Sequence, residues 1–317
     1  MTPIVTRFRA YQLGCEGSSF SYFAGGHFTL IEARLNDTNV RSIAHETAQC
    51  NVTTIDDLHI TSWDDDHCSA SELSILLDAL EPLTIECPGY EPTTDNGKES
   101  RKIIRAYQAA KQNSRRPAAV KFITPEYITG LIVADRLAFR DVLYNPRWID
   151  PDCSNNNSTV QLFRKGSFNL PSLGDVESQN ISAQLRRCKY LRREVDVMIL
   201  AHHGADNGFT NKRFLEHIEP QLAICSSNYD NQYNHPTEEI CNLLYQQGIR
   251  LMTTKTGDVI VVSIDDRTGM FRAVNFKANS TEVSSQQDFR SKKAKLLSYN
   301  ADTIRQLYEG QPSYRNL

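Results

Sequence analysis

The sequence has no long hydrophobic run, no excess of positive charge and no apolar signal segment. No apolar stretch among the 317 residues is long enough to cross a bilayer, so no membrane span is expected. The first residues lack the hydrophobic core of a signal peptide, which predicts a cytoplasmic location. The formal net charge of -3 excludes a general attraction to nucleic acid, so any such contact must come from local basic patches.

Closely spaced cysteine pairs are also missing. The chain has eight cysteines, and none forms a Cys-x-x-Cys pair, which excludes a zinc ribbon. Scattered thiols in a chain without a signal peptide fit a reducing compartment. Hydrophobic residues make up 40% of the chain, which is enough apolar mass for one large core or two smaller ones.

Strand and helix patterns alternate along most of the chain. The opening residues 5–31 read as strands, and later strands are expected at 58–61, 83–86, 159–163, 168–173, 195–200, 222–225, 250–253, 259–264 and 270–276. Helices are expected at 39–49, 69–80, 98–112, 181–193, 211–217 and 237–247. This order predicts an α+β protein built as an αββα sandwich, with two sheets inside and helices outside.

The last part of the chain differs in composition. Residues 1–278 are predicted to form the sandwich domain, and residues 279–317 a polar C-terminal extension that is helical from Gln287 to Tyr308. Apolar residues such as Leu297 and Ile304 form a stripe on that helix, which needs a surface to bury it. We expect the extension to pack against the sandwich or another subunit, and to help set the oligomeric or partner state.

Clusters of Asp and His follow three of the predicted strands. They contain no Lys or Arg, and like charges gathered at strand ends repel one another unless something positive lies among them. The pattern therefore predicts a metal site. The candidate ligands are Asp64, Asp66, His67, Asp175, His202 and His203.

Each cluster also has an ordinary structural interpretation. The aspartates at 64–66 can form a solvated turn or cap the helix that follows them. Asp175 can form an Asx-turn after Gly174, and His202-His203 can be one packed and one exposed side chain. His235, just before Pro236, fits the entry to a helix. The metal interpretation is favoured because the clusters occur together.

Basic residues gather in three places. Two groups are Arg101-Lys102 with Arg105, and Arg115-Arg116. The third lies on the helix that leads into the His-His strand, and we predict that it binds substrate phosphates. Its members are Arg186, Arg187, Arg192 and Arg193.

In their order along the chain, these motifs resemble the metallo-β-lactamase fold superfamily. The similarity is greatest to the soluble hydrolase domain of ComEC-type DNA-uptake proteins, whose motif His-x-Asp-x-Asp-His appears here as residues 62–67 with Ser62 in the first place. The other matching motifs, covering roughly residues 4–276, are Asn155-x-x-Ser158, Gly174-Asp175, His202-His203-Gly204 and Tyr233-x-His235-Pro236.

The resemblance implies an αββα sandwich with a metal cleft at one edge. The positions that match the ligand motifs are Asp64, Asp66, His67, Asp175 and one or both of His202 and His203. Ser62 replaces a histidine, and no histidine lies between His67 and Asp175, where many relatives have another ligand. A ligand set rich in carboxylates suits Zn²⁺ or Mn²⁺, with Mg²⁺ also possible, as one or two ions.

The resemblance also implies an activity. We expect a metal-dependent hydrolase of phosphodiesters, a DNA nuclease, in which Asp175 bridges the metals and Asp66 holds the attacking water. His235 is expected to protonate the leaving oxygen or to complete the ligand shell. The alternatives are hydrolysis of another ester, such as a lactone or thioester, and an interaction protein whose metal site has degenerated.

Overall fold

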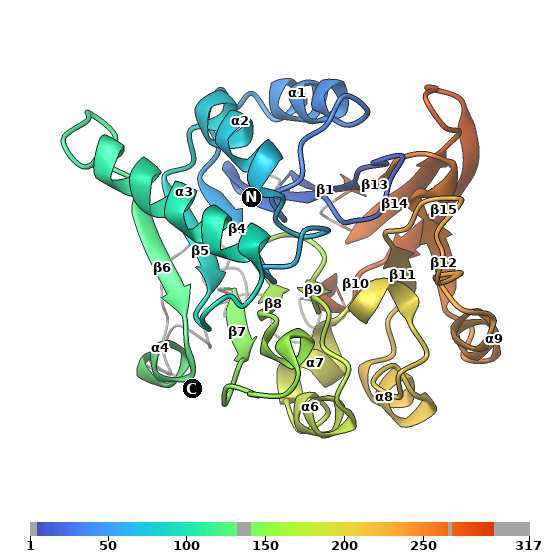
Figure 1. Cartoon of the computed structure of the whole chain (residues 1–317). Helices are drawn as coiled ribbons and strands as arrows, with labels where there is room; N and C mark the ends of the chain where they lie inside the picture. The colour runs from blue at the N-terminus through green and yellow to red at the C-terminus, as the bar shows by residue number, and fades with distance from the viewer. Residues whose placement is uncertain (1–4, 132–140, 266–267, 295–317) are drawn as a thin grey trace, which may run out of the picture.

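The computed structural model describes residues 5–131, 141–265 and 268–294, and shows two β-sheets with helices on their outer sides (Figure 1). In this part of the chain the first sheet has the strand order β15-β14-β13-β1-β2-β3-β4-β5-β6. The bounds are β1 (Thr6–Ala10), β2 (Phe20–Ala24), β3 (His27–Ile31), β4 (Asp57–His59), β5 (Thr84–Pro88), β6 (Ala119–Ile123), β13 (Val259–Asp265), β14 (Met270–Phe276) and β15 (Val283–Arg290). Neighbours are antiparallel from β15 to β3 and parallel from β3 to β6.

The second sheet consists of two three-stranded parts, β7-β8-β9 and β10-β11-β12. The bounds are β7 (Val142–Asn145), β8 (Val160–Phe163), β9 (Leu170–Ser172), β10 (Val197–Ile199), β11 (Leu222–Cys225) and β12 (Arg250–Thr253). The first part is antiparallel and the second is parallel. A bridge between Asn169 and Val195 joins them beside β9 and β10.

Three apolar clusters define the layers. The central one lies between the sheets and joins side chains such as Phe8 and Phe20 of the first sheet to Phe163 and Ile224 of the second. The other two lie under the outer helices. The helices are α1 (Val40–Gln49), α2 (Ala70–Leu80), α3 (Asp95–Lys111), α4 (Pro125–Gly130), α6 (Gln179–Leu185), α7 (Lys189–Glu194), α8 (Lys212–Ile218) and α9 (Glu238–Gln246). The predicted αββα sandwich is confirmed.

Two helices show how sequence and structure compare. The leucine stripe that predicts a helix at 69–80 is buried on α2 through Leu73, Leu76 and Leu77. The single helix predicted at 181–193 is wrong, because the chain turns after α6 and starts α7 with Cys188 as its N-cap. None of the helices in the described ranges has the length and apolar character needed to cross a membrane.

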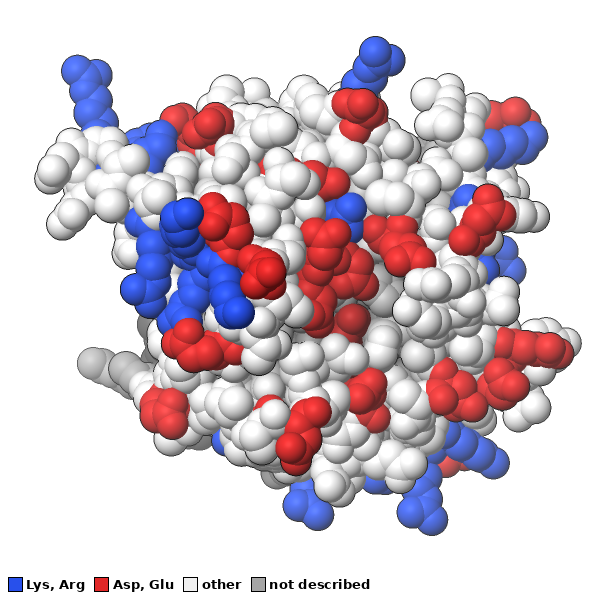
Figure 2. Space-filling view, in the orientation of Figure 1, with Lys and Arg blue, Asp and Glu red and all other residues white. Residues whose placement is uncertain are grey.

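Charge is unevenly distributed on the face shown in Figure 2. Acidic side chains gather near the middle of this face, and a group of Lys and Arg lies beside them, over α3. The middle of the face is where loops at the strand ends of both sheets meet (Figure 1).

The extension predicted from residue 279 begins as a strand. Residues Val283–Arg290 form β15, which pairs with β14, so the helix predicted from Gln287 is wrong for residues 287–290. The reason is tertiary pairing: Phe289 stacks on Phe271 at 5.3 Å between ring centroids, and Asp288 pairs with Arg272. Residues 295–317, with the rest of the predicted helix, lie outside the described residues. The division of the chain into two units stays a prediction.

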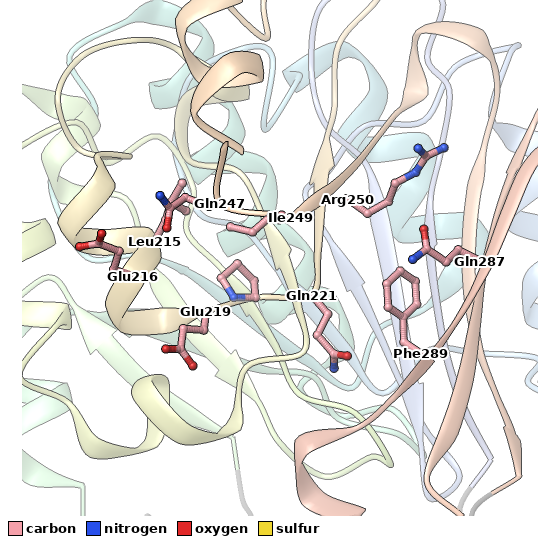
Figure 3. A pocket seen from close by; sticks show the side chains of 11 residues that line it. Leu215, Glu216, Glu219, Gln221, Gln247, Ile249, Arg250, Gln287 and Phe289 are labelled. Carbon is pink, nitrogen blue, oxygen red and sulfur yellow. The ribbon is translucent and has the colours of Figure 1, made fainter. Parts of the chain in front are cut away.

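Strand β15 also borders an open groove of about 550 Å³ (Figure 3). Phe289 and Gln287 form one side of this groove, and Gln221 and Arg250, which stand at the starts of β11 and β12, form another. Its lining contains no histidine or cysteine. The groove therefore lacks the residues that the sequence singles out for chemistry.

The segment after β15 is held against the second sheet. The Lys292 backbone N–H donates to Asp196 Oδ1 at 2.8 Å, and the Lys292 ammonium donates to the carbonyl of Glu219 at 2.8 Å. The buried Lys293 ammonium donates to the carbonyl oxygens of Arg164 and Gly166. The chain thus packs against the second sheet as far as these residues, whereas the predicted helical stripe lies outside the described residues, so its packing stays a prediction.

Burial lowers the pKa of the Lys293 ammonium to about 7, while Glu194, Asp196 and Asp141 favour its charge and Arg164 opposes it. Between pH 7 and about 10.4 the unfolded chain therefore binds more protons at this residue than the folded chain. We expect this lysine to make stability rise with pH in that window, by up to about 1.4 kcal/mol per pH unit. Melting temperatures at pH 6.5 and 8.5 should show a smaller rise for Lys293→Met than for wild type, and equal rises would contradict the assignment.

Candidate metal centre

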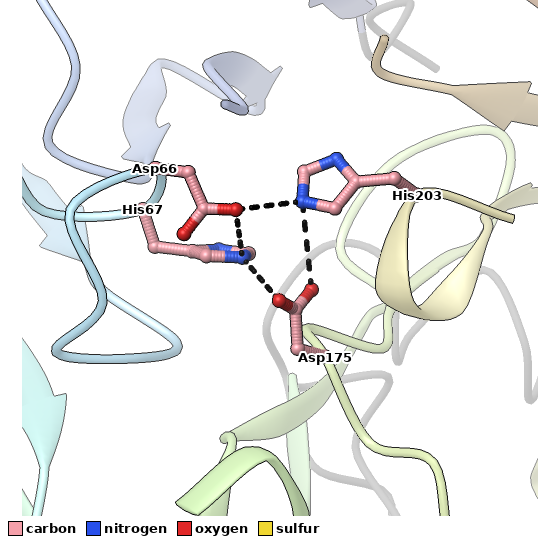
Figure 4. A group of neighbouring side chains, drawn as sticks. All are labelled: Asp66, His67, Asp175 and His203. Atoms are coloured by element: carbon pink, nitrogen blue, oxygen red, sulfur yellow. Dashed lines mark hydrogen bonds and ion pairs between the residues drawn. The ribbon is translucent and has the colours of Figure 1, made fainter. Parts of the chain in front are cut away.

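Four side chains from three separate loops point toward one another (Figure 4). One ligand atom from each lies within 4.8 Å of the other three. They are Asp66, His67, Asp175 and His203, and we call them the four-residue cluster. All four were predicted as ligands from the sequence.

The loops that carry the cluster are tied to one another through the backbone. The N–H of His202 donates to the carbonyl of Gly174 at 3.0 Å, and the N–H of Thr159 donates to the carbonyl of Thr61 at 2.9 Å. Gly174 has a φ of 55°, and a Cβ atom there would lie 2.8 Å from the Ser158 Cβ. Glycine is needed at this position because the loop before Asp175 approaches its neighbours so closely.

The buried Glu32 carboxylate contacts the His67 ring on its Nδ1 side, away from the cluster. Its Nδ1 lies 3.1 Å from Glu32 Oε1, and the Glu32 side chain also accepts from the Thr61 N–H and hydroxyl. With a proton on Nδ1, the lone pair of Nε2 faces the cluster. Nε2 is buried and 2.8 Å from Asp175 Oδ2, yet no described group meets it in hydrogen-bond geometry.

The His203 ring is oriented in the same manner. Its Nδ1 lies 2.9 Å from the carbonyl oxygen of Ser226, an acceptor that fixes the proton on Nδ1. Its Nε2 then faces Asp66 Oδ2 at 3.1 Å and Asp175 Oδ1 at 3.8 Å. The backbone of His203 has a φ of 51°, an uncommon conformation for a residue with a side chain, and it turns the ring into the cluster.

These distances fit a bound cation. Ligand atoms that share one ion at about 2.0–2.2 Å lie roughly 3–4 Å apart. The pairs in the cluster are 2.8 Å (His67–Asp175), 3.1 Å (His203–Asp66) and 3.8 Å (His67–Asp66 and His203–Asp175). Two carboxylates also balance the charge of a divalent ion. The residues present therefore fit a divalent metal.

The electrostatics agree with this interpretation. Burial disfavours a charged His67, but Asp175, Asp66 and Glu32 together raise its pKa well above the usual value. The pKa of His203 is raised against burial by Asp175 and Asp66 in the same way. The carboxylates thus favour protonated imidazoles, and a divalent cation would compete with these protons for the imidazole nitrogens.

Asp64 does not join the cluster. Its Oδ2 accepts from the Ser62 hydroxyl at 2.9 Å, and burial raises the pKa of its carboxyl group. The Ser62 hydroxyl also lies 3.3 Å from the Tyr90 hydroxyl. A serine in the first motif position therefore binds its neighbours and leaves this side of the cleft without an imidazole.

His202 and His235 lie beside the cluster without entering it. The Nδ1 of His202 is 3.3 Å from Glu177 Oε2, and its ring centroid is 6.4 Å from that of His203. The His235 ring is stacked on His203 at 6.4 Å, and burial together with His203 and His202 lowers its pKa to about 4. The geometry brings His203 alone of the adjacent pair into the cluster.

The arginines predicted to bind substrate lie further away. Helix α6 begins just after Glu177, and Arg186 follows its far end, about 10 Å along the helix axis. Arg187 and Arg192 are exposed, and the side chain of Arg193 lies outside the described part of the structure. No contact in the described ranges links them to the cluster, so their role stays a prediction.

Glu32 was not among the site residues predicted from the sequence. This acid directly follows strand β3, as Asp175 follows β9, so the same strand-end rule would have found it. Its distance from the other motifs along the chain hides the contact with His67. Glu177, which approaches His202, was also not predicted, although it lies two positions after Asp175.

Two curated proteins match parts of this chain. ComE operon protein 3 of Bacillus subtilis is 28% identical over 140 residues, which is 43% of this chain and 18% of that protein. Competence protein ComA of Neisseria gonorrhoeae is 41% identical over 58 residues, which is 18% of this chain and 8% of that protein. These matches confirm the resemblance to ComEC-type proteins. The chain spans less than a fifth of the length of either relative.

Among solved structures, the metallo-β-lactamase fold protein YhfI from Bacillus subtilis is similar over 81% of this chain and 100% of its own, with a TM-score of 0.48 and 12% identity. No protein-family model matches the sequence.

Proposed function

We propose that this protein is a metal-dependent hydrolase of phosphodiesters, with DNA as the expected substrate. The observation that carries the proposal is the four-residue cluster, in which two carboxylates and two oriented imidazoles meet at the strand ends. The partial matches to ComE operon protein 3 and competence protein ComA support the ComEC-type resemblance, from which a nucleic-acid substrate is proposed. A lactone or thioester hydrolase would lack that support.

The cluster is suited to one divalent ion. Asp66 and Asp175 would neutralise its charge, and His67 and His203 would donate their Nε2 lone pairs. When bound, the ion would supply a Lewis acid for the phosphoryl oxygens and would acidify a water molecule. Mixed carboxylate and imidazole ligands suit Zn²⁺ or Mn²⁺, with Mg²⁺ a weaker fit. On the side of Asp64 and Ser62, a second ion would meet two groups that already bond to each other.

Residues around the cluster have separate roles in this proposal. Asp66, which is one-third exposed, would orient the attacking water toward the phosphorus atom. His235 lies beside the cluster and, with its pKa lowered to about 4, would be neutral near pH 7, so we propose that it completes the ligand shell and does not protonate the leaving oxygen. His202, held by Glu177, lines the same side and can position the substrate.

The proposal is tested by reloading metal-stripped protein with Zn²⁺, Mn²⁺ or Mg²⁺. We expect one ion per chain by elemental analysis, and cleavage of both bis(p-nitrophenyl) phosphate and a labelled DNA oligonucleotide. A carboxylic ester, a lactone and a thioester serve as comparison substrates. Metal binding with cleavage of these esters alone would overturn the phosphodiester assignment. Failure to bind any of the ions would favour an interaction protein.

A further inference from the structure

Helix α3 presents a row of cations on the face that contains the metal centre. Lys98, Arg101, Lys102 and Arg105 are spaced at i, i+3, i+4 and i+7, which places them on one side of the helix. The row extends over about 10 Å, since each residue adds about 1.5 Å. Figure 2 shows the basic group beside the central acidic group. We call these four residues the α3 basic row.

The helix is fastened to the loop that carries two of the ligands. The Asn96 side chain in its first turn donates to the carbonyls of Trp63 at 3.2 Å and Cys68 at 2.8 Å, and accepts from the Ala70 N–H at 2.9 Å. Trp63 and Cys68 bracket Asp66 and His67 in the chain. The α3 basic row therefore starts two residues from a direct anchor to the metal centre and holds a fixed position relative to it.

Two of the cations are supported by an aromatic ring. The guanidinium groups of Arg101 and Arg105 lie 5.1 and 5.5 Å from the centroid of Phe122 on β6. A guanidinium that stacks on a ring keeps its in-plane N–H groups available for phosphate oxygens. Arg101 also pairs with Glu91, whereas no carboxylate partner of Arg105 is found in the described ranges. Positive charge on this row is thus only partly compensated.

The remaining ion pairs of the row are weak. Lys98 lies 3.8 Å from Asp95, and Lys102 lies 3.1 Å from Glu99, with all four side chains at least half exposed. Exposed pairs of this kind contribute little and exchange readily for another anion. A polyanion can displace them at small cost.

We propose that the α3 basic row binds the phosphate backbone of a nucleic acid and leads it to the metal centre. This rests on the proposed function for the class of substrate. A polyanion approaching the cleft meets a net charge of -3 and the acids at its centre, so it needs local positive charge. A row of about 10 Å runs beside roughly three phosphates of one strand of a duplex, since each strand carries one phosphate per about 3.4 Å of helix axis.

The test uses a variant in which the three exposed cations of the row become neutral: Lys98→Gln, Lys102→Gln and Arg105→Gln. Binding of fluorescent DNA and RNA oligonucleotides of one sequence is measured by anisotropy at several salt concentrations, with EDTA present. We expect affinity for at least one of them to fall about tenfold or more at low salt. The slope of log K against log salt should become shallower by roughly 2 to 3, since each phosphate contact contributes about 0.7–0.9.

A matched control removes three exposed cations elsewhere: Lys212→Gln, Arg213→Gln and Lys277→Gln. We expect it to bind as wild type does. Weakened binding in a third variant, Arg187→Gln with Arg192→Gln, and unchanged binding in the α3 variant would overturn the proposal. Wild-type protein that binds neither oligonucleotide would overturn it as well. The binding measurements do not depend on catalysis. A failure of the bis(p-nitrophenyl) phosphate assay would therefore count against the proposed function and not against the α3 basic row. Equal melting temperatures confirm that the variants are folded.

Discussion

His203→Ala is expected to reduce phosphodiester cleavage by at least about 10³-fold while leaving the fold intact. The substitution removes an imidazole whose Nε2 faces Asp66 and Asp175, so the site would lose one of its four candidate ligands. Loss of a partner that only orients a ligand already costs about 10- to 100-fold, and loss of the ligand should cost more. The variant should bind less than one ion per chain. Cleavage rate and metal content are measured on the same preparations.

The control for this experiment is His45→Ala, because His45 is an exposed histidine on α1. It should retain wild-type activity and metal content. Full activity in His203→Ala, with the ion still bound, would show that the four-residue cluster is not the reaction centre. A large drop in melting temperature would require a milder change, such as Asp175→Asn, before the activity is interpreted.

Glu32→Gln is expected to weaken metal binding by about 10- to 100-fold. The Glu32 carboxylate accepts from the Nδ1 side of His67, and through that contact it fixes the tautomer and raises the basicity of Nε2. A glutamine of the same size keeps the packing but is neutral and accepts at only one of its two polar atoms. Isothermal titration of stripped protein with Zn²⁺ or Mn²⁺ measures the change.

A matched control is Glu72→Gln. Glu72 pairs with Arg34 and accepts from the Leu35 N–H, and its side chain is 17% exposed. We expect this variant to lose stability without losing metal affinity. If Glu32→Gln and Glu72→Gln bind the ion equally well, Glu32 supports the fold alone and has no role in orienting His67.

Strand ends were the most reliable guide to the site. The alternation of strands and helices predicts where the chain leaves each sheet, and Asp66, His67, Asp175 and His203 follow strands whose ends meet in space. That is why the convergence could be predicted from local patterns. The side chain of His203, however, is aimed by a left-handed backbone conformation that no periodicity reports.

The remaining site residues depend on contacts between distant segments. Asp64 accepts a hydrogen bond from Ser62, and His202 lies beside Glu177. A strand-end motif predicts neither contact. The basic residues illustrate the same limit. A continuous helix over 181–193 would carry all of its arginines along one axis. The chain instead breaks between α6 and α7, so these arginines do not share one helix. Three members of the α3 basic row, Arg101, Lys102 and Arg105, were grouped from the sequence, although their position beside the metal centre was not predicted.

The position of β1 in the first sheet affects how the protein folds. This strand lies between β2 and β13, and Arg9 on β1 bonds to Asp258, 249 positions further along the chain. Contacts of such long range carry a large loop-closure cost and slow folding. During synthesis, one edge of β1 stays unpaired until most of the chain has left the ribosome, and an unpaired edge invites association with other chains. Yield of folded protein should therefore depend on slow synthesis and on chaperones that cover this edge.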